Sequence, residues 1–284
     1  MEHSFNIRPY ARLLTMLGEQ LITNEQIALA KKKKNAYDAD AEWVKVSFLN
    51  FNDDFTVNSD SKIVIEDDGN GMNEQIIEKH WLNPATPEKK KRKKIKETTD
   101  KGRILQGEKG IGRFAIFKLG KKISIYTRRQ KWDNKDKKFI EGGEDVENIV
   151  EYDFSAYDED FLEKNGEETE LYIDELQVVF HQRTPQIIVD KDVELGGIVR
   201  KRKPHGTIIE IADLKTNWTE NRVNQIQKEI GKLQPIFSEE QKIDFRVWIY
   251  KDLEVHRSNE LYREKLLNCL NSKAVLKITH GFYK

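Results

Sequence analysis

Cysteine is almost absent from this sequence, which has one such residue, Cys269, among 284. A single thiol forms no intrachain disulfide and supplies no thiolate cluster for a metal, so a disulfide-stabilised or thiolate-metal fold is excluded. Long apolar runs are also missing, because no stretch approaches the roughly 20 residues that a membrane-spanning helix needs. The N-terminal residues lack the apolar segment of a secretory signal. We therefore expect a cytoplasmic protein without a membrane partner.

Net charge is lacking too, since 49 acidic residues balance 49 basic ones. This balance argues against a globally basic nucleic-acid-binding protein, although basic runs at 89–96 and 200–203 keep DNA open as a partner. Charged residues make up 35% of the chain and apolar residues 37%, proportions that predict long solvated loops beside the core. A chain of this length still buries enough surface to be stable without crosslinks.

The sequence does contain an apolar pattern that changes between helical and strand spacing, which indicates a mixed α and β protein. Helical spacing predicts helices over residues 9–17, 23–38, 73–81 and 219–233. Alternating or short continuous apolar runs predict strands over residues 43–49, 62–66, 122–128, 149–154, 170–174, 207–212 and 243–250.

Two segments depart from this pattern. Residues 82–107 show no clean periodicity, contain two prolines and carry seven basic residues between Lys89 and Lys96. A long loop of this kind inside a compact domain is often a lid over a site. Residues 141–170 hold thirteen acidic residues and one basic residue, Lys164, and we expect them to form a surface insertion.

A glycine-rich segment precedes an apolar run that is expected to be helical, with glycines at 107, 110 and 112. Glycine lets a ligand approach the main chain, and the free N–H groups at a helix start favour an anion. Lys109 adds a positive charge, so the segment is either a phosphate cradle or an ordinary tight turn. It matches neither a Walker A loop nor a dinucleotide-binding fingerprint.

Two further segments carry polar groups suited to a nucleotide. Asp67 ends a predicted strand and is followed by Gly69, Gly71 and Met72. A buried carboxylate there could accept a hydrogen bond from an exocyclic amine, with room for a flat base beside methionine, although a simple strand-to-helix turn is the alternative. Asn35, inside a predicted helix that its propensity disfavours, offers an uncharged oxygen for a hard cation such as Mg²⁺.

Taken in order, these segments resemble the motifs of the GHKL ATPase superfamily, which includes the DNA gyrase B subunit, the large heat-shock chaperones, sensor histidine kinases and MutL, and which MORC proteins share. Residues 35–39 (NAYDA) resemble its N box, residues 67–71 its adenine box, and residues 107–112 its lid box. His205, Gly206 and Thr207 resemble a fourth family segment, where a threonine lies near the adenine. The resemblance spans residues 10–215.

The resemblance implies an α+β fold, the Bergerat ATP-binding fold. This is a two-layer α/β sandwich with helices on one face of a mixed, mostly antiparallel sheet. It also implies a division of the chain into an N-terminal arm (1–22), an ATP-binding domain (23–218) with its lid at 82–106 and the acidic insertion at 141–170, and a C-terminal extension (219–284) that starts a second, transducer-like domain.

The same resemblance implies Mg²⁺ and ATP or ADP as ligands, with Asn35 binding the metal. Asp67 would bind the adenine amino group with support from Thr207, and Asp38 would belong to the nucleotide-binding N box. The residues implied to line the base are Gly69, Gly71 and Met72. The residues implied to meet the phosphates are Gly107, Lys109, Gly110, Ile111 and Gly112.

One position departs from the family. Lys31 stands one helical turn before Asn35, where hydrolytic members place the glutamate that activates water, so the implied catalytic position is inactive. Lys32 and Lys33 follow where the family has apolar residues, although burying an unpaired ammonium is costly. Three explanations stay open: an altered stretch in place of a Glu-Leu-Val-like run, an ATP-binding protein without hydrolysis, or a helix that bends outward here.

The expected function is ATP binding that closes the lid, drives homodimerisation through residues 1–22 and acts on a downstream domain. The chaperone, MutL and MORC branch fits better than a histidine kinase, since only His3 precedes the N box and the lid is long. A hydrolysis-deficient ATP-sensing interaction module is one alternative. A DNA-associated ATPase of the MORC or MutL type is another.

Overall fold

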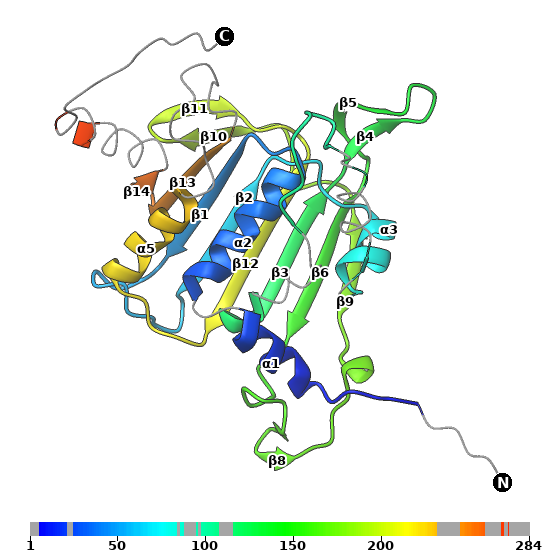
Figure 1. Cartoon of the computed structure of the whole chain (residues 1–284), viewed down its shortest axis with the longest axis vertical. Helices are drawn as coiled ribbons and strands as arrows, with labels where there is room; N and C mark the ends of the chain where they lie inside the picture. Colours follow the sequence, from blue (N-terminus) through cyan, green and yellow to red (C-terminus); the bar gives the residue numbers. More distant parts are fainter. Residues whose placement is uncertain are drawn as a thin grey trace, which may run out of the picture.

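The computed structural model describes residues 6–21, 25–83, 86–87, 95, 98–107, 116–231, 245–258, 268–269 and 272. Its centre is an eight-stranded sheet with the strand order β14-β13-β1-β2-β12-β3-β6-β9 (Figure 1). All neighbours in this sheet are antiparallel except β1 and β13, which are parallel. The strands are β1 (Trp43–Leu49), β2 (Lys62–Asp67), β3 (Gly120–Arg128), β6 (Glu147–Asp153), β9 (Val179–Arg183), β12 (Gly206–Leu214), β13 (Arg246–Lys251) and β14 (Glu254–Ser258).

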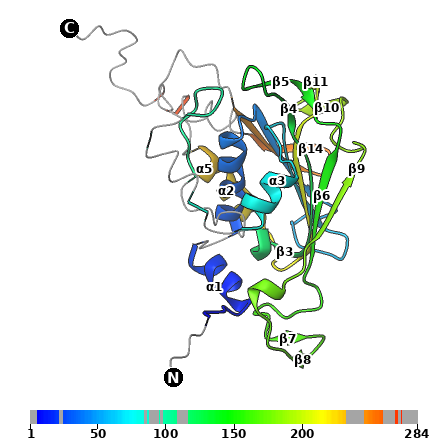
Figure 2. The same ribbon diagram turned by 90° about the vertical axis from the view of Figure 1, so that its right-hand side faces the viewer.

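Several helices lie together on one face of the sheet, as the edge-on view in Figure 2 shows. They are α1 (Arg12–Leu21), α2 (Glu25–Asp38), the short α3 (Glu74–Ile76) that continues into a π-helical turn η1 (Ile77–Trp81), and α5 (Glu220–Gly231). The predicted two-layer α+β sandwich is therefore confirmed.

Strand alternation creates the core between these layers. Ile63 and Ile65 of β2 and Ile209 and Ile211 of β12 are buried on the helix side, because every second side chain of a strand points to the same face. Leu29 of α2 packs against this surface. A sheet with one face covered in this way buries one continuous apolar layer, and the pocket described below lies at its edge.

Three small hairpins extend from the sheet: β4 (Gln130–Asp133) with β5 (Lys138–Gly143), β7 (Glu163–Lys164) with β8 (Glu167–Glu168), and β10 (Asp192–Leu195) with β11 (Ile198–Lys201). The β10–β11 hairpin covers part of the face that carries no helices. Its Val193 and Leu195 form a second apolar cluster with Trp43, Trp248 and Tyr250.

The predicted strand over 170–174 is wrong. The structure has instead the 3-10 turn η3 (Ile173–Glu175), with a single β-bridge between Tyr172 and Tyr10. The apolar residues there face a short N-terminal segment rather than a sheet neighbour: the Ala11 N–H donates to the Leu171 carbonyl at 2.8 Å. The Ile173 N–H also donates to the Pro9 carbonyl at 3.1 Å, so the run pairs with residues 9–11 around a single bridge and does not extend into a ladder.

Two parts of the predicted domain division can be placed. Strand β6 runs through the acidic stretch at 141–170 as an inner strand between β3 and β9, while β7 and β8 lie outside the main sheet. Strands β13 and β14, from the expected C-terminal extension, join the main sheet beside β1. The division itself stays a prediction. Among the described residues, the helices are too short or too polar to cross a membrane.

Candidate functional site

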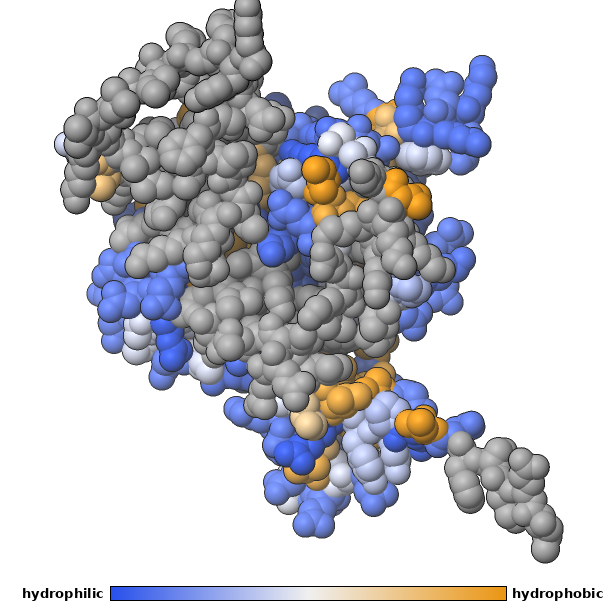
Figure 3. Space-filling model, viewed as in Figure 1, coloured by the Kyte–Doolittle hydropathy of each residue, from blue (hydrophilic) through white to orange (hydrophobic). Residues whose placement is uncertain are grey.

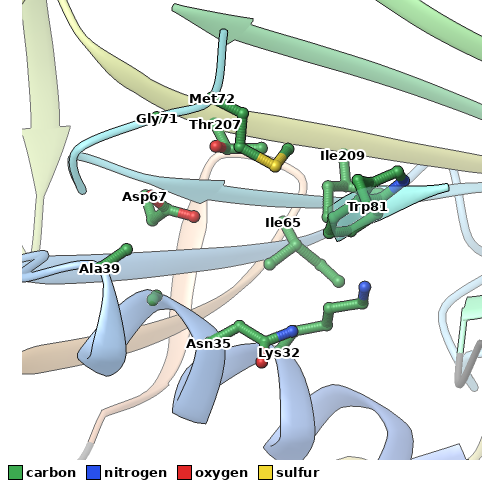
Figure 4. A pocket seen from close by; sticks show the side chains of 11 residues that line it. Lys32, Asn35, Ala39, Ile65, Asp67, Gly71, Met72, Trp81, Thr207 and Ile209 are labelled. Atoms are coloured by element: carbon green, nitrogen blue, oxygen red, sulfur yellow. The ribbon is translucent and has the colours of Figure 1, made fainter. Parts of the chain in front are cut away.

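One pocket opens between α2 and the helix-facing side of the sheet, with a volume of about 90 Å³. Figure 4 shows side chains from the helix and from the strands facing the same hollow. Five of the sequence-predicted residues meet there, namely Asn35, Asp67, Gly71, Met72 and Thr207. The other lining residues are Lys32, Ala36, Ala39, Ile65, Trp81 and Ile209.

Asp67 is the acidic group of this pocket and ends β2 on its helix-facing side. The carboxylate accepts the Gly69 N–H at 2.9 Å, which fixes its orientation. Burial raises the pKa of Asp67 to about 7, and the N–H groups of Gly69 and Thr207 and the charge of Lys32 offset only part of that rise. The side chain is thus a strong hydrogen-bond acceptor when ionised, in a pocket that is otherwise largely apolar.

A hydroxyl network holds the opposite wall. Thr207 pairs in register with Asp67, and its hydroxyl lies 3.1 Å from the hydroxyl of Thr127. The Thr127 hydroxyl also accepts the Met72 N–H at 2.9 Å, while the Asn148 amide donates to the Met72 carbonyl at 3.1 Å. The backbone of Met72 is therefore fixed from both sides, which positions its side chain at the pocket.

The glycines after β2 allow this segment to pass close to its neighbours. Gly71 has φ +64, and a Cβ atom at this position would lie 2.0 Å from the Arg128 carbonyl oxygen. A Cβ at Gly69 would lie 2.9 Å from the Ala39 carbonyl oxygen, so this glycine lets the turn pack on the end of α2. Tight packing thus accounts for both glycines, and Gly71 lines the pocket as well.

Helix α2 provides the other wall. Asn35, Ala36 and Ala39 follow helical spacing on one face, so they reach the pocket together. The two alanines leave space, while Asn35 supplies the amide (Figure 4). Asn35 and Ala36 lie in the continuous helix Glu25–Asp38, and Ala39 follows it directly, with its N–H donating to the Asn35 carbonyl at 3.0 Å.

Lys32 and Lys33 are buried in this helix, with 4% and 3% of their surface exposed. An outward bend of α2, one of the three explanations left open by the sequence, is therefore not found at these two residues. The Lys32 ammonium lies 4.6 Å from the Trp81 ring centre, and the Lys33 ammonium 5.6 Å from the Phe245 ring centre. Burial, aided by the neighbouring Lys34, lowers the pKa of Lys33 to about 7.

Asp38 lies beside the pocket rather than in its lining. Its two carboxylate oxygens accept the N–H groups of Gln106 at 2.8 Å and Gly107 at 3.0 Å. The structure thus brings Gly107, the first residue of the predicted phosphate loop, to the end of α2. The remaining predicted phosphate-binding residues, Lys109, Gly110, Ile111 and Gly112, lie outside the described residues, as does the side chain of Lys31.

Several lining residues escaped the sequence prediction. Ile65 and Ile209 could have been found, because each lies two residues from a predicted site residue on the same strand and so shares its face. Trp81 lines the pocket and donates its indole N–H to the Tyr152 hydroxyl at 3.0 Å, a position that no local sequence pattern predicts. No sequence pattern predicted Lys32 as a lining residue, because its charge argued against a place in an apolar pocket.

A helix layer over one face of a mixed sheet, with an acidic strand end and an asparagine on the covering helix facing one pocket, defines an α+β domain with a pocket between its two layers. The chain belongs to the family described as histidine kinase-, DNA gyrase B-, and HSP90-like ATPase, whose family model matches residues 23–169, more than half of the chain. Thr207 lies beyond the matched residues. No curated protein matches this sequence.

Proposed function

We propose that this chain binds ATP with Mg²⁺ in the pocket between α2 and the sheet, and that Asp67 recognises the adenine amino group. The observation that carries this proposal is the convergence of Asn35, Asp67, Gly71, Met72 and Thr207 on one pocket within a domain of the ATPase family. A carboxylate held by the Gly69 N–H presents a fixed acceptor to an exocyclic amine.

Asn35 would hold the metal. No group of three or more His, Cys, Asp or Glu side chains suited to a metal ion occurs in the described part of the chain. One amide oxygen nevertheless fits Mg²⁺, because this ion commonly takes few protein ligands and completes its shell with phosphate oxygens and water. When bound, the ion would neutralise phosphate charge, and Asn35 would orient it at the pocket.

The experiment is calorimetry of the chain with Mg²⁺-ADP and with a non-hydrolysable ATP analogue, beside the variants Asp67→Asn and Asp174→Asn. Asp174 is an exposed acid that pairs with Arg8, so its variant changes the charge equally without touching the pocket. We expect saturable binding to the wild type and to Asp174→Asn, and loss of binding in Asp67→Asn. Equal binding to all three proteins would contradict the adenine assignment.

We further propose that ATP closes the lid over the pocket and brings two copies together through the N-terminal arm. Apolar side chains gather at the surface around α1, as Figure 3 shows. Ile7, Leu13 and Met16 are 99%, 38% and 43% exposed. An apolar surface of this kind is typical of a protein–protein contact.

An ATP-sensing module that binds without turnover is the second candidate, and Lys31 favours it. The residue stands on α2 four positions before Asn35, and a lysine is a poor base unless it loses its charge. Within the family we place the chain nearer the chaperone, MutL and MORC branch than the histidine kinases. Salt-dependent DNA binding would favour a DNA-associated role.

A further inference from the structure

Helix α2 has a second contact surface opposite the pocket. Lys33 and Tyr37, one turn apart, both meet Phe245, the residue directly before β13. The Tyr37 ring meets the Phe245 ring edge-on, with 5.6 Å between centres and an interplanar angle of 87°. Phe245 is buried, with 3% of its surface exposed. The helix that lines the pocket therefore also touches the start of β13.

Arg103 completes this contact from a third segment. Its guanidinium carbon lies 4.8 Å from the Tyr37 ring centre and 5.6 Å from that of Phe245. The same guanidinium donates to the Ala41 carbonyl at 2.7 Å and to the Tyr37 carbonyl at 3.3 Å. A planar cation with several fixed donors can stack on rings and bond carbonyls at once, which a lysine cannot reproduce.

The segment that carries Arg103 is tied to the end of α2 on both sides. Asp40, buried and in the left-handed backbone region with φ 59, accepts the Thr99 hydroxyl at 2.5 Å and the Lys101 N–H at 3.2 Å. The Thr99 hydroxyl in turn accepts the Arg103 N–H at 3.0 Å. At the other end, Asp38 accepts the Gln106 and Gly107 N–H groups. Residues 99–107 are thus fixed to α2 by buried or partly buried acids.

Strand β13 receives the contact at its first residues. The Arg246 N–H donates to the Glu42 carbonyl at 2.8 Å, and β13 then pairs in parallel with β1 from Trp43 onward. A shift of Arg103 or Phe245 would therefore displace the first residues of the parallel ladder between β13 and β1. We call Tyr37, Asp40, Arg103 and Phe245 the α2–β13 junction.

We propose that the α2–β13 junction couples nucleotide occupancy to β13, with Arg103 as the positioning residue. This inference rests on the proposed nucleotide site. A ligand in the pocket contacts α2, and the end of α2 is joined to the segment 99–107 through Asp38 and Asp40. Occupancy therefore acts on Arg103 where its guanidinium lies against Tyr37 and Phe245. Coupling between two sites is reciprocal. If nucleotide binding stabilises the packing of Phe245 by a given factor, a change that loosens this packing weakens nucleotide binding by up to that factor.

Hydrogen exchange on the whole chain tests this coupling, with and without saturating Mg²⁺-ADP, combined with calorimetric affinities. In the wild type, ADP should slow exchange of the Arg246–Lys251 amides. Arg103→Ala should abolish that ADP-dependent change and weaken ADP binding about tenfold, within the usual range of coupling between sites. Arg103→Lys should restore neither the ADP-dependent change in exchange nor the ADP affinity, because lysine keeps the charge but loses the planar donors.

Phe245→Leu tests the coupling at the β13 side of the junction. It keeps an apolar side chain at position 245 and serves as the second variant if Arg103→Ala does not fold. We expect weaker ADP binding although Phe245 is not among the pocket-lining residues. Lys251→Ala is the matched control. Lys251 is the last residue of β13 and lies away from the junction, with its ammonium 5.5 Å from the Phe55 ring centre. Wild-type chain that binds no ADP would refute the nucleotide site itself. Wild-type binding together with control-like behaviour of Arg103→Ala and Phe245→Leu would overturn the coupling alone.

Discussion

The surroundings of each ionisable side chain set its pKa, and two acids near α2 show this in opposite directions. The raised pKa of Asp67, about 7, means that folding makes its charge unfavourable. Glu42, an exposed side chain outside the pocket, is the opposite case: partial desolvation opposes ionisation, yet hydrogen bonds from Lys203 and Lys101 hold its pKa down to about 2. The acid poised to titrate near neutral pH is therefore the one in the pocket, which is typical of a functional group.

Asp67 gives a pH-dependent prediction. An ionised carboxylate is the better acceptor, so ADP affinity should rise about tenfold from pH 6 to pH 8 as the carboxyl loses its proton near pH 7. The pKa of Asp67 in the folded chain lies above its ordinary value of 3.8, so the free energy of unfolding falls as pH rises between these two values and stays lower above them. Asp67→Asn should therefore unfold at a higher temperature than wild type at pH 8, while losing ADP. Calorimetry and thermal melts at both pH values check this, and a flat affinity profile would contradict it.

Lys31 gives the prediction about turnover. Placing a carboxylate one turn before Asn35 supplies the missing general base, for which contributions of 10²–10⁴-fold are typical. We expect Lys31→Glu to raise phosphate release at least about 100-fold over a wild type that binds ATP with little turnover. Lys31→Gln is the control, since it removes the charge but adds no base. Equal release from Lys31→Glu and Lys31→Gln would exclude Lys31 as the cause of low turnover.

At the scale of elements, most predicted helices and strands are present, but β9 and β14 of the main sheet were not predicted. The predicted strands at 43–49 and 62–66 correspond to β1 and β2 within one residue. Their apolar residues alternate as expected, although β1 is buried on both faces because Trp43 joins a second apolar cluster. Helix 9–17 shifted to Arg12–Leu21, since spacing alone does not locate the first turn. The prediction of a strand at 170–174 failed because this segment meets only the short stretch 9–11, which gives one β-bridge instead of a ladder.

The pocket was predictable to the extent that local motifs define it. Asp67, Gly71 and Met72 lie on one turn, so their proximity follows from sequence. Trp81 and Thr127 depend on how β3 and η1 meet that turn, which no local pattern encodes. Lys32 was excluded by hydropathy and yet is buried against Trp81, so tertiary packing overrode the expectation.

The turn after β2 provides the prediction at this scale. Gly71→Ala adds a Cβ against the Arg128 carbonyl oxygen at a positive φ, and should lower the free energy of unfolding by about 3 kcal/mol. Gly166→Ala is the control, because its φ of +83 is similar but nothing lies within 4 Å of the added Cβ. That variant should lose only about 1 kcal/mol. Urea denaturation of the two variants measures the difference, and equal losses would show that the close approach is unimportant.

At the scale of the whole molecule, the N-terminal arm is held against one end of the fold. Arg8 lies 4.0 Å above the Tyr172 ring and pairs with Asp174 and Glu175 at 3.1 and 2.7 Å. Tyr10 stacks on Tyr172 with 4.6 Å between ring centres. These contacts fix the position of residues 8–10 against residues 172–175. The exposed apolar side chains nearby are therefore held in place, which would favour the proposed contact with a second copy of the chain.

Dimerisation is the prediction for the whole chain. A non-hydrolysable ATP analogue should double the mass measured by light scattering, and Leu13→Ser with Met16→Ser should prevent this doubling because both side chains are partly exposed on α1. Ile198→Ser, at an equally apolar position 55% exposed on β11, serves as control and should still dimerise. An unchanged mass with the analogue in the wild type would contradict nucleotide-driven dimerisation.

The parallel pairing of β13 with β1 has a practical consequence for anyone shortening this chain. Ending it after residue 218, at the boundary that the motifs suggest, would remove β13 and leave β1 as the edge of the sheet. The unpaired backbone of β1 would then lie open beside Trp43 and Val44, both buried in the full chain. Open apolar edges recruit strands from other molecules. Such a shortened chain should therefore aggregate, even though it retains every motif of the nucleotide pocket.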